Sequence, residues 1–304
     1  MEAIKLENVS KSYGDIKAVK NLSLNIVKGE TFGIVGPDGA GKTTTIRMIM
    51  GLISPGSGMI TVNGISVMSE KKKAQKSLGY LSQKFSIYPD LSIDENIGFF
   101  AKINGVTGFN ERRDMLLELT GLINFRNRPA GKLSGGMKQK LALCCALIHK
   151  PEIILLDEPT VGVDPVSRRD FWEILSDLKK DDITIFMSTP YLDEAERCNR
   201  VALINKGEII ISGEPGHLKD SVDFMILEVV PEDLTTAREI LIKSEDINFQ
   251  MFGDKVNFVI SKGEALKYSE QIELPELFGI KVNTFRIRKP NLENIFIHLI
   301  KDSY

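Results

Sequence analysis

Residues 36–44 fit the pattern G-x-x-x-x-G-K-[ST] of a phosphate-binding loop. Glycines in this loop let the backbone fold closely around a phosphate, so that successive N–H groups point inward. Lys42 would bring a positive charge to the β- and γ-phosphates of a nucleotide, and the Thr43 hydroxyl can ligate Mg²⁺. The predicted loop consists of Gly36, Pro37, Asp38, Gly39, Ala40, Gly41, Lys42, Thr43 and Thr44.

The segments on both sides of the loop support this prediction. Residues 30–35 form an apolar run that is typical of a buried strand, and residues 43–52 place apolar side chains at helical spacing. A helix N-terminus after a strand suits phosphate binding because the helix dipole adds positive potential there. The alternative is a glycine-rich turn that contains a lysine by chance. It does not account for the predicted strand before the loop and the predicted helix after it.

A pair of carboxylates follows the apolar run 153–156. Asp157 ends a predicted central strand of a parallel sheet, and Glu158 comes directly after it. Beside a phosphate loop, the first carboxylate can hold Mg²⁺ directly or through water. The second is then placed to orient and deprotonate a water for in-line attack on a γ-phosphate. We therefore predict Asp157 as a metal ligand and Glu158 as a catalytic base.

Composition limits the class of protein. The chain has 304 residues, enough for two domains, and its formal net charge of -2 gives no reason to expect a nucleic-acid partner. No run approaches the roughly 18 apolar residues of a membrane span, and residues 1–5 lack the features of a signal peptide. Cys144, Cys145 and Cys198 show no metal-ligand spacing, and their odd number favours a reducing compartment.

The pattern along the chain predicts an α/β core with two additions. Residues 1–29 alternate as paired strands, and residues 84–150 carry helical periodicity over 94–102 and 111–119 without strand signals. A boundary is predicted near 213–221. Beyond it the order is βαββαβ, a ferredoxin-like split unit. Its predicted strands are 225–230, 247–252, 255–260 and 280–288, and its predicted helices are 231–244, 264–272 and 291–301.

A third motif completes a resemblance to a known family. Residues 133–140 read L-S-G-G-M-K-Q-K and precede the Asp157–Glu158 pair. Together with the phosphate loop, this resembles the signature motif of ABC-type ATPases. The resemblance covers about residues 1–217. It implies a P-loop NTPase (RecA-like) core with an antiparallel β subdomain and an α-helical subdomain. The βαββαβ pattern beyond this region predicts a small ferredoxin-like α+β domain at 222–304.

The resemblance also implies roles for further residues. Tyr13 would stack on adenine, although a half-buried strand aromatic is the alternative interpretation. Gln83 would ligate Mg²⁺, act in catalysis and sense the membrane partner, and Asp164 would span a dimer interface. In this family two domains pack head to tail, so the signature motif of one copy would close over the ATP held by Lys42 of the other. The motif residues that would bind nucleotide in this way are Ser134, Gly135 and Gly136.

One position departs from the family pattern. Where the family usually places a histidine after a Ser-Thr pair, this chain has Pro190, which offers neither a side-chain donor nor a backbone N–H. The usual γ-phosphate contact is therefore missing, which predicts either slow hydrolysis or a site in which Glu158 and Thr189 suffice. The chain's histidines lie elsewhere, and none is an evident substitute. They are His149, His217 and His298.

Residues 158–165, 191–196 and 289–296 resemble the exporter branch that serves drugs and polysaccharides. We therefore expect an ATP-hydrolysing exporter subunit that uses ATP and Mg²⁺. It would work as a homodimer or heterodimer of ATP-binding subunits with a separately encoded permease, at the cytoplasmic face of the cell membrane. Residues 84–103 match the surface facing the permease, with simple helix capping an equally good interpretation. The rivals are a non-transport ABC ATPase and an importer ATPase, whose C-terminal extension would more often be a β-barrel.

Overall fold

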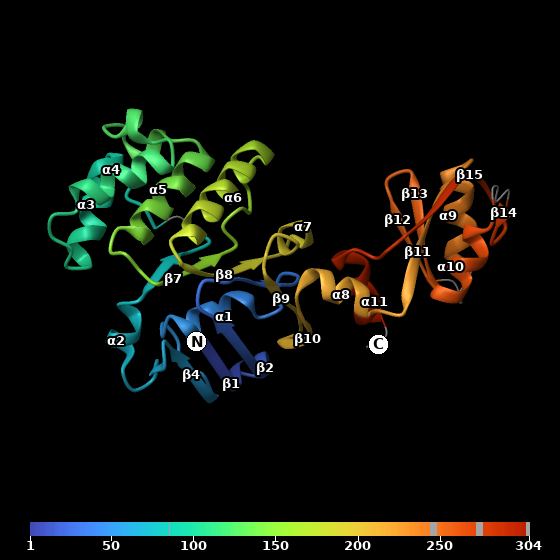
Figure 1. Ribbon diagram of the computed structural model, residues 1–304, viewed down its shortest axis with the longest axis horizontal. Coiled ribbons are helices and arrows are strands. Elements are labelled where there is room, and N and C mark those ends of the chain that lie inside the picture. The colour runs from blue at the N-terminus through green and yellow to red at the C-terminus, as the bar shows by residue number, and fades with distance from the viewer. Residues whose placement is uncertain (85, 244–247, 272–275, 302–304) are drawn as a thin grey trace. The chain divides into compact units, whose positions relative to one another are not determined.

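The structure, a computed structural model, describes residues 1–84, 86–243, 248–271 and 276–301. It divides the chain into two units, Met1–Pro215 and Gly216–Tyr304 (Figure 1). The predicted ends at residues 244, 247 and 272 lie outside the described residues.

The central sheet of the first unit has the strand order β10-β9-β3-β8-β7-β6 and is parallel except for the β9–β10 hairpin. Every residue of β3, β7 and β8 is buried, which explains their continuous apolar runs. Because these neighbouring strands are parallel, the segments that follow them emerge at one edge of the sheet. The strands are β3 (Thr31–Val35), β6 (Leu78–Leu81), β7 (Ile153–Asp157), β8 (Thr184–Thr189), β9 (Arg200–Asn205) and β10 (Glu208–Gly213).

A second, antiparallel sheet has the order β2-β1-β4-β5. Helix α1 (Lys42–Ile49) contacts strands of both sheets, and the apolar side chains of the two sheets and α1 form one core. The N-terminal end of α1 is thereby fixed at the edge where β3 ends. The strands are β1 (Glu2–Tyr13), β2 (Ile16–Val27), β4 (Ser57–Val62) and β5 (Ile65–Ser66).

The described positions between residues 84 and 150 form helices and contain no strand, as the periodicity predicts. Helix α3 begins at a capping box in which Ser92 accepts from the Glu95 amide and the Glu95 carboxylate accepts from the Ser92 amide. Helix α5 contacts both α3 and β6, which joins the insert to the sheet (Figure 1). The helices are α3 (Ile93–Ile103), α4 (Asn110–Leu119) and α5 (Gly135–Leu147), with short 3₁₀ turns at Ile123–Phe125 and Ala130–Lys132.

The remaining helices of the first unit differ in whether a side chain caps their first turn. Asp164 is the N-cap of α6 (Pro165–Lys180), and proline occupies the first helical position as predicted. The sequence pattern did not predict the short helices α7 and α8. The shorter helices are α2 (Lys71–Gln75), α7 (Leu192–Ala195) and α8 (Pro215–Ser221), of which α8 spans the division between the units.

The second unit has an antiparallel sheet in the order β12-β13-β11-β15-β14, and its long strands follow the order of a ferredoxin-like split unit. The predicted helix 231–244 begins too early, because β11 continues to Pro231 and Asp233 caps the helix. The elements are β11 (Phe224–Pro231), α9 (Leu234–Ile242), β12 (Phe249–Phe252), β13 (Lys255–Ser261), α10 (Lys262–Ser269), β14 (Glu276–Leu277), β15 (Ile280–Arg288) and α11 (Leu292–Lys301).

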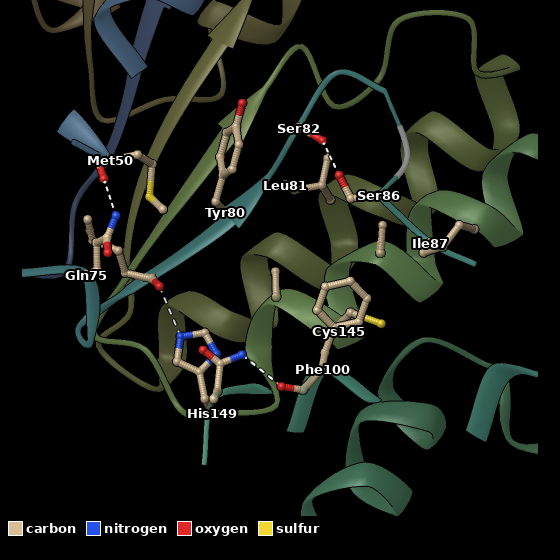
Figure 2. A pocket seen from close by; sticks show the side chains of 14 residues that line it. Met50, Gln75, Tyr80, Leu81, Ser82, Ser86, Ile87, Phe100, Cys145 and His149 are labelled. Carbon is tan, nitrogen blue, oxygen red and sulfur yellow. Dashed lines mark hydrogen bonds between the residues drawn. The ribbon is translucent and has the colours of Figure 1, made fainter. Parts of the chain in front are cut away.

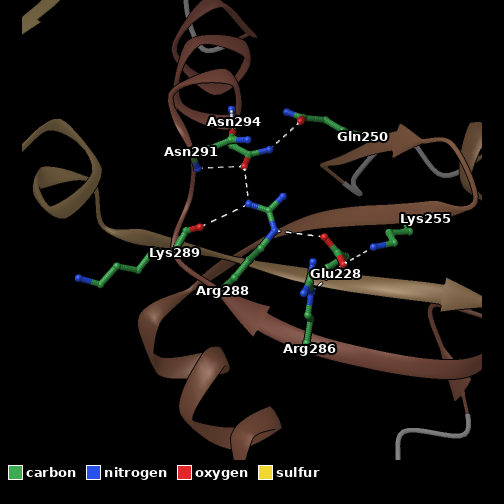
Figure 3. Close-up of polar contacts among 8 residues, drawn as sticks. All are labelled: Glu228, Gln250, Lys255, Arg286, Arg288, Lys289, Asn291 and Asn294. Atoms are coloured by element: carbon green, nitrogen blue, oxygen red, sulfur yellow. Dashed lines mark hydrogen bonds and ion pairs between the residues drawn. The ribbon is translucent and has the colours of Figure 1, made fainter. Parts of the chain in front are cut away.

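A charged cluster lies on one face of this sheet (Figure 3). Glu228 accepts hydrogen bonds from Lys255 at 3.0 Å, Arg286 at 2.7 Å and Arg288 at 3.2 Å. Arg288 also donates to Asn294 at the start of α11, so the cluster connects three strands to the last helix. Burial of Glu228 opposes its ionisation, but the bonds from Arg286 and Lys255 outweigh this and lower its pKa to about 2.

The substitution Glu228→Gln tests the cluster. It leaves the neighbouring cations without their counter-charge, so we expect the free energy of unfolding of the second unit to fall by about 2 kcal/mol at pH 7. Folding lowers the pKa of the Glu228 carboxyl. The stabilisation that Glu228 provides is therefore complete at pH values above its unfolded pKa of 4.5 and is lost as the pH falls through about 2. Urea unfolding of the full chain at several pH values measures this difference.

Glu239→Gln, which changes an exposed carboxylate on α9, is the matched control. Equal stability of the two variants at pH 7 would contradict the role assigned to Glu228.

Candidate functional site

The loop between β3 and α1 has backbone geometry that requires glycine at particular positions. A Cβ on Gly36 would clash with the carbonyl oxygen of Ile204, and one on Gly41 would clash with that of Ala18. Gly41 also has φ +105°, a conformation that other residues rarely adopt. The loop therefore passes close to the backbone of two other segments, and its shape is fixed by those contacts.

Lys42 lies inside this loop, with its side chain only 3% exposed. Its ammonium group donates to the carbonyl oxygens of Gly36 at 2.7 Å and Pro37 at 3.0 Å. It also forms an ion pair with Glu158 Oε1 at 3.1 Å. The predicted lysine and the predicted base are thus in direct contact, although the two residues come from the loops after different strands.

The Asp157 carboxylate meets the start of α1. Thr43 Oγ1 donates to Asp157 Oδ1 at 2.9 Å, and Ser188 Oγ donates to the same atom at 2.8 Å. No donor among the described residues reaches the second oxygen, Oδ2, although that atom is buried. The Thr43 hydroxyl and the Oδ2 atom of Asp157 are oxygen ligands of the kind that a hard cation such as Mg²⁺ prefers.

Glu158 has an uncommon backbone conformation, with φ +49°. Its amide donates to the carbonyl oxygen of Ser188 at 3.1 Å and to Ser188 Oγ at 3.0 Å, which holds the turn in place. Its carboxylate accepts from Gln83 Nε2 at 2.9 Å. Ser188 therefore holds the carboxylate of Asp157 and the backbone amide of Glu158. The sequence motifs did not single out Ser188, although its position at the end of β8, opposite Asp157 of β7, was an available signal.

Lys42, Thr43, Gln83 and Glu158 border a cavity of about 400 Å³. Tyr13 lies on its wall with 49% of its surface exposed, and Lys11 Nζ lies 5.5 Å from the centre of its ring. An exposed ring at the rim leaves a face available for stacking. The lining residues are Tyr13, Ala18, Asp38, Gly39, Ala40, Gly41, Lys42, Thr43, Thr44, Gln83 and Glu158.

The L-S-G-G motif is not among the residues that line this cavity. Ser134 is instead the N-cap of α5 and accepts from the Met137 amide at 3.3 Å, so Gly135 and Gly136 form the first turn of that helix. Asp164 caps α6 in the same way, and hydrogen bonds from the amides of Ser167 and Val166 lower the pKa of its carboxyl. Within one chain, these residues do not contact the cavity of Lys42.

The Thr189 hydroxyl, the predicted substitute for the missing histidine, is bonded within the protein. The Thr189 hydroxyl donates to Glu194 Oε2 at 2.6 Å, and Glu194 is fully buried. The same hydroxyl accepts from the Tyr191 amide at 3.0 Å. Both bonds hold the backbone on either side of Pro190, so this hydroxyl is already engaged within the protein.

Comparisons with known proteins give the family. The profile of the ABC transporter family matches residues 19–161. The linearmycin resistance ATP-binding protein LnrL of Bacillus subtilis is 34% identical over 304 residues, which cover 97% of each chain. This chain belongs to the ABC transporter family. The resemblance predicted from the three motifs is confirmed.

Two further relatives agree with this result. The probable multidrug ABC transporter ATP-binding protein YbhF of Escherichia coli is 47% identical over 210 residues, which cover 68% of this chain but only 36% of that protein. The ATP-binding cassette MJ0796 was solved as a dimer bound to ADP and Pi. It is 30% identical with a TM-score of 0.64 and covers 69% of this chain and 98% of that one. The predicted fold class is confirmed.

The substitution Lys42→Ala tests the cavity as an ATP site. The phosphates would lose the ammonium group at the centre of the loop, so we expect ATP affinity to fall by at least about 100-fold. Isothermal titration calorimetry on the folded variant measures it. Lys102→Ala, on an exposed part of α3, should bind ATP like the parent protein. Undiminished affinity of Lys42→Ala would remove this cavity as the binding site.

Proposed function

We propose that this chain is the ATP-hydrolysing subunit of an ABC-type membrane exporter. The observation that carries the proposal is the cluster of Lys42, Thr43, Asp157 and Glu158 beside the cavity. Phosphoryl transfer requires mainly positioning and charge stabilisation. In this cluster the cation Lys42 is paired with the base Glu158, and the metal-ligand residues Thr43 and Asp157 are bonded to each other.

In this proposal, each residue of the cluster has one task. Lys42 and the loop amides bind the β- and γ-phosphates, and Tyr13 stacks on the adenine. Glu158 orients the attacking water and accepts its proton at a carboxylate oxygen, while Gln83 holds that carboxylate. Mg²⁺ would be held by Thr43, Asp157 and Gln83, and when bound it neutralises charge on the phosphate oxygens.

The signature motif of one subunit is proposed to act on the nucleotide that the other subunit binds. Ser134, Gly135 and Gly136 would close over the nucleotide that the partner holds, since the start of α5 offers free amide groups and a positive helix end. Asp164 would lie at the interface between the two subunits. The dimeric cassette MJ0796, bound to ADP and Pi, supports this arrangement. ATP binding would favour the closed dimer and hydrolysis the open one.

Pro190 changes the chemistry of the hydrolytic step. Without a histidine, the segment after β8 offers no side-chain donor at this position, and Thr189 is already bonded to Glu194. We therefore assign proton acceptance to Glu158 and expect basal hydrolysis to be slow. A contact made only in the transition state affects turnover more than ATP affinity.

A second cavity, of about 280 Å³, is the proposed docking site of the permease (Figure 2). Its wall is formed by β6, by α3 and α5 of the helical insert, and by the end of α1. Ser82 and Ser86 lie on either side of Gln83, which bonds the Glu158 carboxylate. A short segment of the permease in this cavity would therefore contact the stretch that carries Gln83. The lining includes Met50, Gln75, Tyr80, Leu81, Phe100, Cys145 and His149.

The apolar surface extends beyond the cavity along the predicted permease-facing stretch 84–103. The Tyr88 ring is 47% exposed and packs edge-on against Phe99, with 4.6 Å between ring centres. Across the described parts of the chain, no helix is long and apolar enough to cross a membrane. The proposed place of the subunit, at the cytoplasmic face of the membrane, therefore depends on the permease.

The relatives favour an exporter over the rival interpretations. LnrL is named a linearmycin resistance protein and YbhF a probable multidrug transporter protein, and both are ATP-binding proteins. The second unit of this chain is an α+β sheet with helices rather than a β-barrel, which the importer alternative would favour. A permease gene beside the gene for this chain would argue against a non-transport ATPase.

The substitution Glu158→Gln tests the proposed base. The amide keeps the size of the side chain but cannot accept the proton, so ATP should bind while hydrolysis falls by at least about 100-fold. We expect the variant to accumulate as an ATP-bound dimer in size-exclusion chromatography. Phosphate release under steady state gives the rate. Turnover at the parental rate would exclude Glu158 from the mechanism.

The substitution Ile87→Glu tests the docking cavity. A charge on its apolar lining should reduce co-purification of the permease from native membranes by about 10-fold without changing ATP affinity. Leu266→Glu, on an exposed part of α10 in the second unit, is the control. Equal recovery of the permease with both variants would contradict docking at this cavity.

A further inference from the structure

Glu194, in the short helix α7, is a fully buried carboxylate outside the motifs of the site. Its Oε1 atom accepts from Thr160 Oγ1 at 2.6 Å, from Arg168 Nε at 2.7 Å and from Trp172 Nε1 at 3.3 Å. Its Oε2 atom accepts from Thr189 Oγ1 at 2.6 Å. A buried carboxylate with this many donors holds all of their segments in one arrangement.

Each of these segments carries a residue of the site. Thr160 lies two positions after Glu158, in the loop that ends at Asp164. Thr189 directly follows Ser188, which bonds both Asp157 and Glu158. Arg168 and Trp172 belong to α6, the helix that Asp164 caps. Glu194 therefore connects the loop of the base, the end of β8 and the helix at the proposed dimer interface.

The charge of Glu194 is balanced locally. Arg168 forms an ion pair with Glu194 at 2.7 Å and another with the exposed Asp193 at 2.6 Å, and its guanidinium lies 4.4 Å from the centre of the Tyr191 ring. The cation thus also fixes the residue that follows Pro190. A glutamine at position 194 would keep the shape but remove the negative charge that orders these donors.

We infer that Glu194 is a positioning residue for ATP hydrolysis. It holds the Glu158 loop and the segment 189–191 in fixed positions relative to each other. The base therefore keeps its orientation although Pro190 contributes no donor. This inference rests on the proposed role of Glu158 as the base. Small displacements of a base relative to its water reduce turnover strongly.

The substitution Glu194→Gln in the full chain is the first test. We expect kcat to fall by about 10-fold or more, with the Kd of ATP changed by less than about twofold, since none of the side-chain hydrogen bonds to Glu194 comes from Lys42 or its loop. A residue with only a structural role would lower the folded fraction and leave kcat per folded molecule unchanged. Active-site titration with ATP therefore accompanies each rate measurement.

Removing one hydrogen bond to Glu194 at a time provides a second test, and this test does not remove a buried charge. Thr160→Val and Thr189→Val keep the size of each side chain and remove one hydroxyl each, and we expect kcat to fall by about 5-fold in each. Because both hydroxyls act through one carboxylate, the double variant should lose less than the product of the single losses. Thr120→Val, a buried threonine of the helical insert that donates to the Leu116 carbonyl, is the matched control.

The outcomes separate this inference from the proposed function. Stalled hydrolysis in Glu158→Gln together with parental kcat in Glu194→Gln, Thr160→Val and Thr189→Val would overturn the inference alone. Losses that multiply independently in the double threonine variant would also overturn it. Parental turnover in Glu158→Gln would overturn the assignment of the base, and this inference with it.

Discussion

The ion pair between Lys42 and Glu158 is the contact on which the geometry of the site depends. Both side chains are buried, and their charged atoms lie 3.1 Å apart. Either charge alone would be costly in this environment, because burial removes the water that stabilises it. The carbonyl oxygens of Gly36 and Pro37 satisfy further donors of Lys42, and Gln83 donates to Glu158. The pair therefore fixes the loops after β3 and β7 relative to each other.

The parallel sheet makes this pairing possible. Strand β8 lies between β3 and β7, so the segments that follow all three strands meet at one edge. Ser188 at the end of β8 bonds Asp157 and supports the turn at Glu158. Thr189, the next residue, continues the connection to Glu194. The middle strand thus contributes no reacting group of its own but orders the groups on both sides.

Local sequence features predicted the parts of the site that depend on short-range patterns. The phosphate loop and the carboxylate pair each follow an apolar strand, and Asp164 with Pro165 marks a helix start, so periodicity and capping chemistry were sufficient. The contacts of Glu194 could not be predicted in this way, because its partners Thr160 and Arg168 lie 34 and 26 positions away. The bond from Thr189 to Glu194 could not be predicted from local patterns either, because it depends on the three-dimensional packing of α7 against β8. The start of α9 was misplaced because β11 extends one residue beyond its apolar pattern.

A double-mutant cycle on ATP binding tests the central contact most directly. If the Glu158 carboxylate competes with the phosphates for Lys42, Glu158→Gln should raise ATP affinity several-fold. The same substitution should leave affinity unchanged when Lys42 is already Met. Isothermal titration calorimetry on the parent, the two single variants and the double variant gives the coupling. A gain of equal size in both backgrounds would show that Glu158 acts on the nucleotide independently of Lys42, and would contradict this account.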